Sequence, residues 1–180
     1  MSDPADGRAS RRALRRAGRR DYPPRGLHLI DVENLVGTAT PDPALARYLR
    51  ARYLLLVGVG TWDQVVIASS HLALKKTGCW WPGARYLVRS GPDGADLALL
   101  DLAGDEHIAE RFSQVTIASG DGIFAPVAAS LAGAGCQVSV ISRRAGLSRQ
   151  LALAAGWKVT YIDPPGTHAP PSAARPPRAA

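Results

Sequence analysis

Aspartates stand at three points of this sequence where an ordered α/β protein would place a ligand. Asp31 lies near the end of the strand-like run 27–32. Asp121 follows the apolar run 114–118 and stands between two glycines. Asp96 stands in the first turn of a helix-like segment. Each has an ordinary structural explanation, because Asp serves as a helix N-cap and is stabilised in the first helical turn. Taken alone, Asp31 favours the cap.

These explanations weaken when the three acids are considered together. Ligands of open parallel sheets bind outside the carboxyl ends of the strands, and like charges gathered there raise one another's pKa unless a cation is present. Carboxylate oxygens suit Mg²⁺ or Mn²⁺, and such ions promote phosphodiester cleavage. We therefore expect Asp31, Asp96 and Asp121 to be the catalytic, metal-binding residues. Asp101 lies about 140° around a helix from Asp96. We expect it to assist as a further metal ligand, which requires either that Asp96 precedes the helix proper or that Asp101 lies at the rim.

The elements that must position these acids alternate along residues 26–162. The pattern predicts strands at 27–32, 64–68, 84–88, 114–118, 137–141 and 157–162. It predicts helices at 43–57, 94–110, 123–134 and 148–155, with a short helix or turn at 69–76. Such alternation is typical of a sheet covered on both faces. We expect a three-layer α/β/α fold with a central, mainly parallel sheet of five to six strands.

Length and charge define the domain organisation. The 180 residues, 46% of them hydrophobic, suffice for one domain with a core. The net charge of +7 is concentrated in residues 1–25, which hold eight Arg and three Asp. We expect 1–25 to be a disordered, Arg-rich arm, equally consistent with phosphate binding and with a solvated leader. Residues 163–180 are expected to be a disordered Pro/Ala-rich tail, which leaves 26–162 as the domain.

The cysteines and the hydropathy bear on the compartment. Cys79 and Cys136 are far apart, lack metal-site spacing and are expected to be small core residues of a reduced, cytoplasmic protein. No apolar run reaches the roughly 20 residues of a membrane span. The Arg-rich start also lacks the apolar segment of a secretory signal. We expect no membrane partner.

Residues 30–34, 94–99 and 119–127, in this order, resemble the motifs of the NYN domain family, a branch of the PIN-like nucleases. The similarity extends over residues 27–162. It implies metal-dependent hydrolysis of RNA in an acidic pocket. By position, Asp31, Asp96 and Asp121 match the family's metal-binding carboxylates, and Asn34 matches the polar residue after the first of them. Ile123 stands where the family usually has another acid, and Asp101 lies one residue before the usual position.

The leading hypothesis is thus a metal-dependent endoribonuclease with RNA as its partner. The departure at Ile123 leaves open a non-catalytic RNA-binding or regulatory module with a degenerate nuclease site. A small-molecule phosphatase or nucleotide-binding protein ranks last, because the second Asp of a haloacid-dehalogenase motif is replaced by Glu33 and no P-loop is present. The oligomeric state stays open, a homodimer included.

Several polar side chains are candidates for substrate contact. We expect Asn34 and Ser119 to contact RNA, together with Arg143 and Arg144, which follow a strand that ends at the same rim. Other residues have two equal interpretations: phosphate contact or a solvated face for Lys75, Lys76, Arg85 and Arg89, and base stacking or loop packing for Trp80 and Trp81. His71 is expected to be an exposed loop residue.

Overall fold

The computed structural model describes residues 24–166, so most of the predicted arm and tail lie outside the described residues. Within this range the strands form one six-stranded sheet in the order β3-β2-β1-β4-β5-β6, and every neighbouring pair is parallel. The strands are β1 (Gly26–Asp31), β2 (Gln64–Ser69), β3 (Arg85–Val88), β4 (Gln114–Ala118), β5 (Gln137–Ser142) and β6 (Val159–Tyr161). The predicted parallel sheet is confirmed.

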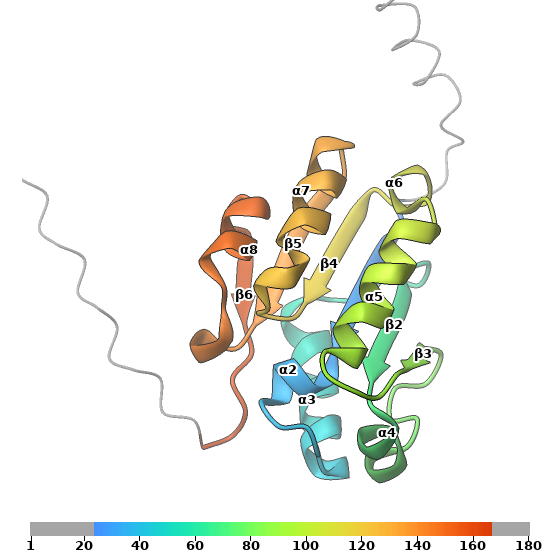
Figure 1. The fold of residues 1–180 in the computed structure, drawn as a ribbon, viewed down its shortest axis with the longest axis vertical. Coiled ribbons are helices and arrows are strands. Elements are labelled where there is room, and N and C mark those ends of the chain that lie inside the picture. The colour runs from blue at the N-terminus through green and yellow to red at the C-terminus, as the bar shows by residue number, and fades with distance from the viewer. Residues whose placement is uncertain (1–23, 167–180) are drawn as a thin grey trace, which may run out of the picture.

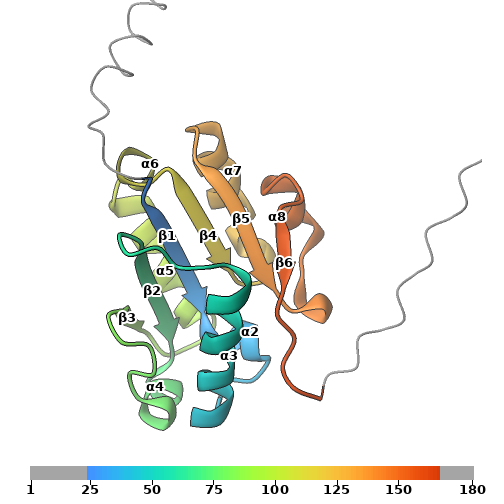
Figure 2. The ribbon, with the colours of Figure 1, turned by 180° about the vertical axis from the view of Figure 1, so that it is seen from behind.

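Helices cover both faces of this sheet, which confirms the three-layer arrangement. Figure 1 shows α5 (Gly94–Asp105), α7 (Ala125–Gly133) and α8 (Arg149–Ala154) in front of the strands. From behind, α3 (Pro43–Leu56) lies over the carboxyl end of β1 (Figure 2). Three short helices lie in the connections between these elements: α2 (Val32–Val36) between β1 and α3, α4 (His71–Thr77) between β2 and β3, and α6 (Ile108–Arg111) between α5 and β4. None of the helices in residues 24–166 is long and apolar enough to cross a bilayer.

Strand β1 lies at the centre of the sheet and is buried along its whole length. Its alternate side chains enter two cores, as the two-residue period of a strand requires. Leu27 and Leu29 pack in the core beneath α5, α7 and α8. Ile30 packs in the core beneath α3. Because both faces are buried, the position of Asp31 at the strand's end is fixed by packing from both sides.

The element boundaries differ from the prediction where the backbone turns. Val32, predicted as the end of a strand, is the first residue of the unpredicted helix α2. The segment predicted as one helix over 94–110 is two helices, because His107 adopts φ 47° and interrupts the helical hydrogen bonds. The last strand begins at Val159, since Trp157 adopts φ 61°.

The two cysteines differ in burial. Cys136 is buried as expected, but Cys79 is exposed, so the prediction that Cys79 is a core residue was wrong.

Asp63 anchors the amino end of β1. Its Oδ1 accepts a hydrogen bond from the Gly26 N–H at 2.6 Å, and its Oδ2 accepts one from the Gly60 N–H at 2.7 Å. The same Oδ2 lies 3.3 Å from Nε2 of the buried His28, whose Nδ1 contacts the Tyr53 hydroxyl at 2.8 Å. Partial burial raises the pKa of Asp63, but these donors outweigh it, so the pKa lies below its ordinary value.

Replacing Asp63 with Ala should therefore destabilise the protein. Loss of a charged acceptor shared by two backbone N–H groups should lower the free energy of unfolding by about 1.5–3 kcal/mol at pH 7, measurable by urea unfolding. The difference from wild type should vanish in acid, because protonation removes this contribution as the pH falls through the lowered pKa. Asp105→Ala, at an exposed position on α5, is the control. Equal stabilities of the two variants would contradict this role.

Candidate active site

Asp31 is both the last residue of β1 and the N-cap of α2. Its Oδ1 accepts the N–H of Asn34 at 3.1 Å, and its Oδ2 accepts the Ser119 hydroxyl at 3.4 Å. Only 3% of the residue is exposed. The helix-cap interpretation of Asp31 is therefore correct, and it does not compete with a role in a site. The cap fixes one oxygen while the carboxylate faces the start of α5.

Asp96 lies in the first turn of α5, and its carboxylate is within hydrogen-bonding reach of that of Asp31. Gly94 allows this approach, because a Cβ at that position would lie 2.4 Å from the carbonyl oxygen of Arg89. When both carboxylates are ionised, Oδ1 of Asp96 is buried with no hydrogen-bond donor among the described residues. A buried oxygen of this kind is costly unless a proton or a cation binds it.

Burial and proximity change the protonation of this pair. Burial, followed by the charge of Asp96, raises the pKa of Asp31 to about 8. The pKa of Asp96 is also raised, chiefly by burial and further by the charges of Asp121 and Asp93. Two carboxylates in contact cannot both ionise freely. At neutral pH the metal-free pair therefore retains a proton, which a divalent cation would displace.

The third predicted ligand, Asp121, is exposed and lies outside the pocket that the other two line. Its Oδ1 accepts the N–H of Ile123 at 2.9 Å and so caps the 3₁₀ turn Gly122–Phe124. Across residues 24–166, no three His, Cys, Asp or Glu side chains are arranged to hold a metal ion. The structure thus brings together Asp31 and Asp96, with Asp121 near enough only to act on the pKa of Asp96.

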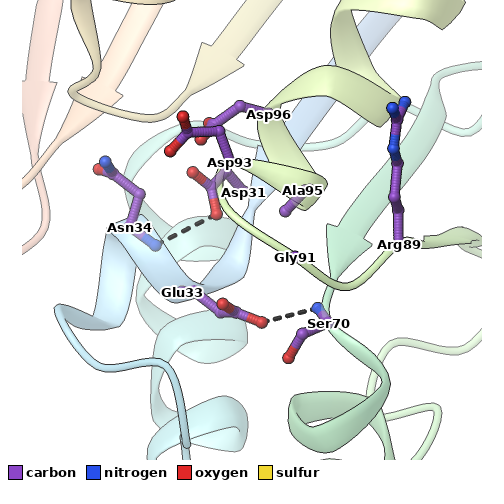
Figure 3. Close-up of a pocket in the computed structure, with 10 residues that line it drawn as sticks. Asp31, Glu33, Asn34, Ser70, Arg89, Gly91, Asp93, Ala95 and Asp96 are labelled. Atoms are coloured by element: carbon purple, nitrogen blue, oxygen red, sulfur yellow. Dashed lines mark hydrogen bonds between the residues drawn. The ribbon is translucent and has the colours of Figure 1, made fainter.

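The pair opens into a pocket of about 200 Å³ between the ends of β1 and β2 and the start of α5 (Figure 3). The pocket is lined by Asp31, Glu33, Asn34, Ser70, Arg89, Gly91, Asp93, Gly94, Ala95 and Asp96. Two of its acids were missed. Glu33 reaches the pocket because the turn into α2 brings its Oε1 to 2.7 Å from the Ser70 N–H. Asp93 adopts φ 52°, and the Asp-Gly pair before the helix was the available signal.

Asn34 and Ser119 were predicted to contact substrate, and they differ. Asn34 lines the pocket, and its Oδ1 accepts the Gly120 N–H at 2.9 Å. Ser119 is completely buried and donates to Asp31, so it can only position that carboxylate. Gly120 is packed closely as well, since a Cβ there would lie 2.1 Å from the carbonyl oxygen of Gly146. These contacts hold the loops after β1, β4 and β5 together.

The predicted basic contacts are engaged elsewhere. Arg143 donates through Nε to the carbonyl oxygen of Asn34 at 2.7 Å. Arg144 binds Asp163, a residue assigned to the tail, through its backbone N–H at 2.9 Å and its guanidinium at 3.3 Å, and it lies over the Tyr161 ring. Both arginines therefore stabilise the rim, and the prediction that they are free for substrate is not supported by these contacts.

Asp101 is not placed with the acidic pair. Its Oδ2 lies 2.9 Å from Nη1 of Arg89, and 68% of its side chain is exposed. It is absent from the pocket lining, as its position around α5 relative to Asp96 explains. The predicted role of Asp101 as a metal ligand is thus corrected to a partner of Arg89.

The other residues considered for substrate contact lie outside the pocket lining. Arg85 begins β3, at the opposite end of the strand from the pocket, and pairs with Glu106. His71 is exposed as expected, with its Nδ1 2.9 Å from the Ser90 hydroxyl. Lys75 and Lys76 lie exposed in the last turn of α4. Trp81 is buried against Tyr53, so loop packing is its role, and Trp80 packs on its edge.

Comparison with known proteins does not assign a family. No protein-family model and no curated protein matches the chain. A protein of unknown function from Vibrio parahaemolyticus is similar in structure at 15% identity, with a TM-score of 0.48 and coverage of 81% of this chain and 95% of that one. An isochorismatase-like hydrolase from Alkaliphilus metalliredigens has 12% identity, a TM-score of 0.31 and coverage of 78% and 92%. Similarity this low carries no argument about activity.

Removing one charge from the pair should stabilise the metal-free protein. Because the pKa of Asp31 is about 8 in the fold and about 3.9 when unfolded, wild type should lose stability as the pH rises between these values. Asp31→Asn keeps the cap and lacks this dependence. Its melting temperature in EDTA should exceed that of wild type at pH 8 by at least about 2–4 °C, the equivalent of 1 kcal/mol, with little difference at pH 4.5.

The matched control is Asp42→Asn. Asp42 is also an N-cap, accepting the Leu45 N–H at 2.8 Å, but it is exposed and does not line the pocket. The same chemical change there should leave the pH dependence as in wild type. An Asp31→Asn protein that is no more stable than wild type at pH 8 would show that the two carboxylates do not repel in solution.

Proposed function

We propose that this protein is a metal-dependent endoribonuclease that hydrolyses RNA phosphodiester bonds at the Asp31–Asp96 pocket. The observation that carries the proposal is the contact between the buried carboxylate of Asp31 and the half-buried carboxylate of Asp96, whose Oδ1 is buried without a donor among the described residues. The similarity of residues 30–34, 94–99 and 119–127 to NYN motifs supports RNA as the substrate. The active residues would be Asp31 and Asp96, with Asp121 nearby.

The donor set fits a hard divalent cation such as Mg²⁺ or Mn²⁺. Mg²⁺ is often held by only one or two carboxylates, with water and substrate phosphate completing its coordination. Asp31 and Asp96 would hold the ion, and the exposed carboxylates of Asp93 and Asp121 lie close enough to raise the pKa of Asp96. A bound ion would neutralise the pair and supply Lewis-acid activation of water and phosphate.

The residues around the pair would keep it in a fixed geometry. Ser119 holds Oδ2 of Asp31 and the N–H of Asn34 holds Oδ1, so this carboxylate cannot rotate freely. The Asn34 side chain in turn binds Gly120 and connects α2 to the loop after β4. Preorganised groups of this kind avoid reorganisation during the reaction. The chain's contribution would be to present the two carboxylates together at one rigid edge.

A non-catalytic RNA-binding module is the second candidate. It is favoured by Ile123, a residue that is 36% exposed at the position where the NYN family usually has an acid, and by the lack of a three-ligand arrangement in residues 24–166. Under this alternative the pair would be a remnant, and phosphate binding would come from basic residues. Net charge supports either function, because eight Arg lie in residues 1–25.

Cleavage of labelled single-stranded RNA with Mn²⁺ distinguishes the two. We expect wild type to cleave, EDTA to stop cleavage, and Asp31→Asn to lower the rate by at least about 100-fold, more than the loss of a supporting contact to a ligand. RNA affinity, measured by fluorescence anisotropy, should stay within about 2-fold, since removing one acid does not weaken phosphate contacts. Mn²⁺ should also raise the melting temperature of wild type and not of Asp31→Asn.

Asp42→Asn should cleave as wild type does. Metal-independent binding without any cleavage by wild type would favour the non-catalytic module. Neither cleavage nor binding would remove both candidates.

A further inference from the structure

We propose that Arg89 is the phosphate-binding residue of this pocket and that Asp101 positions it by holding the guanidinium away from the acidic pair. The inference rests on the proposed function, in that an RNA strand occupies the pocket. It concerns the binding of the strand and not the cleavage step, so the two can fail separately. The motivating observation is that Arg89 lines the same pocket as four acidic residues.

The charges that line the pocket are strongly unequal. Four lining residues are acidic, namely Asp31, Glu33, Asp93 and Asp96, and Arg89 is the single lining residue with a positive charge among residues 24–166. Such a pocket repels a phosphodiester even after one divalent cation binds, because a formal charge of −4 exceeds +2. A phosphate beside the pair therefore needs a further cation, and Arg89 is placed to supply it.

The backbone of Arg89 is fixed on both sides. Its N–H donates to the Ser69 carbonyl oxygen at 3.1 Å, which continues the pairing of β3 with β2. Its own carbonyl oxygen packs against Gly94, at the start of α5. The base of the side chain is thus held between the end of β2 and the helix that carries Asp96. Only the side chain, which is 48% exposed, can respond to a ligand.

The guanidinium does not turn toward the nearby acids. Figure 3 shows Arg89 extended along α5, with its nitrogens pointing away from Asp31, Asp93 and Asp96. Its Nη1 lies 2.9 Å from Oδ2 of Asp101, one turn and a half beyond Asp96 on the same helix. An unrestrained arginine beside carboxylates would pair with them. The contact with Asp101 prevents this and leaves the pair accessible.

This contact leaves most of the arginine's binding capacity unused. A guanidinium has five N–H donors in a planar fork, and among the described residues one of its nitrogens contacts Asp101. An exposed ion pair stabilises a protein very little, so its value lies in orientation. Arginine binds a phosphate through two parallel hydrogen bonds, which lysine cannot reproduce. Arg89 would thus hold a backbone phosphate next to the scissile one.

The chain offers a matched control at the opposite end of β3. Arg85 and Arg89 are both arginines of the β3 segment with half-exposed side chains, 49% and 48%, and both pair with an acid of the α5 region. Arg85 stands at the other end of the strand, outside the pocket lining. The pairs Arg85–Glu106 and Arg89–Asp101 therefore differ in their distance from the acidic site, and Glu106 also binds Arg111.

The test is the affinity of the full chain for a fluorescein-labelled, single-stranded oligouridylate with Ca²⁺ in place of Mn²⁺, measured by anisotropy between 50 and 200 mM salt. Arg89→Ala should raise Kd about 5- to 10-fold and reduce the slope of log K against log salt by about 0.7, the loss of one phosphate contact on a single strand. Arg89→Lys should recover only part of the affinity. Asp101→Asn should raise Kd by about 3-fold, because the arginine is released toward the acids.

Arg85→Ala and Glu106→Gln should leave both the affinity and the salt slope as in wild type. In the Mn²⁺-dependent cleavage assay, Arg89→Ala should raise KM with kcat within about 3-fold, the signature of lost binding rather than lost chemistry.

If Arg89→Ala binds RNA with the wild-type salt slope, or if Arg85→Ala has an equal effect, the inference is wrong, whether or not wild type cleaves. If wild type does not cleave but Arg89→Ala weakens binding as expected, the endoribonuclease proposal fails and the assignment of Arg89 stands.

Discussion

The rest of the site depends on one unfavourable contact, that between the carboxyl groups of Asp31 and Asp96. Both backbone segments are held by packing: β1 is buried along its length, and α5 begins at a glycine pressed against the Arg89 carbonyl oxygen. With both backbone segments held in place, a proton or a cation relieves the repulsion between the acids. A fold that keeps such a contact accepts lower stability at the position where its chemistry would occur.

The two ends of β1 place the same residue type in opposite environments. At the amino end Asp63 accepts three donors and its pKa falls, whereas at the carboxyl end Asp31 faces another carboxylate and its pKa rises. The difference follows from strand direction. The carboxyl ends of parallel strands open toward helix starts and loops, where ligands bind, while the amino end is closed by a turn that supplies N–H groups. A carboxylate is thus stabilised by donors at one end and destabilised by a second carboxylate at the other.

The layers of the fold and the meeting of Asp31 with Asp96 could be predicted from the sequence, because strand-to-helix alternation and a shared sheet edge need only local patterns. The roles of Ser119, Asp101 and Asp93 could not. Ser119 is buried next to Gly120, which packs against the loop after β5. Asp101 is turned toward Arg89 by the helical step, and Asp93 depends on a positive φ. Each is decided by tertiary contacts or backbone angles, which composition and spacing do not encode.

The central position of β1 also bears on how the protein folds. Its two partner strands are far from it along the chain, because Leu27 pairs with Gln64 and Gly26 pairs with Gln114. All five strand pairings are parallel, so each closes a long loop, and folding of such topologies is slow. The two acids meet only after α5 has docked on a formed sheet, which places their repulsion near the native end of the reaction. Interactions formed that late act mainly on the unfolding rate. A cation that relieved the repulsion would lengthen the lifetime of the folded state and change the speed of folding far less.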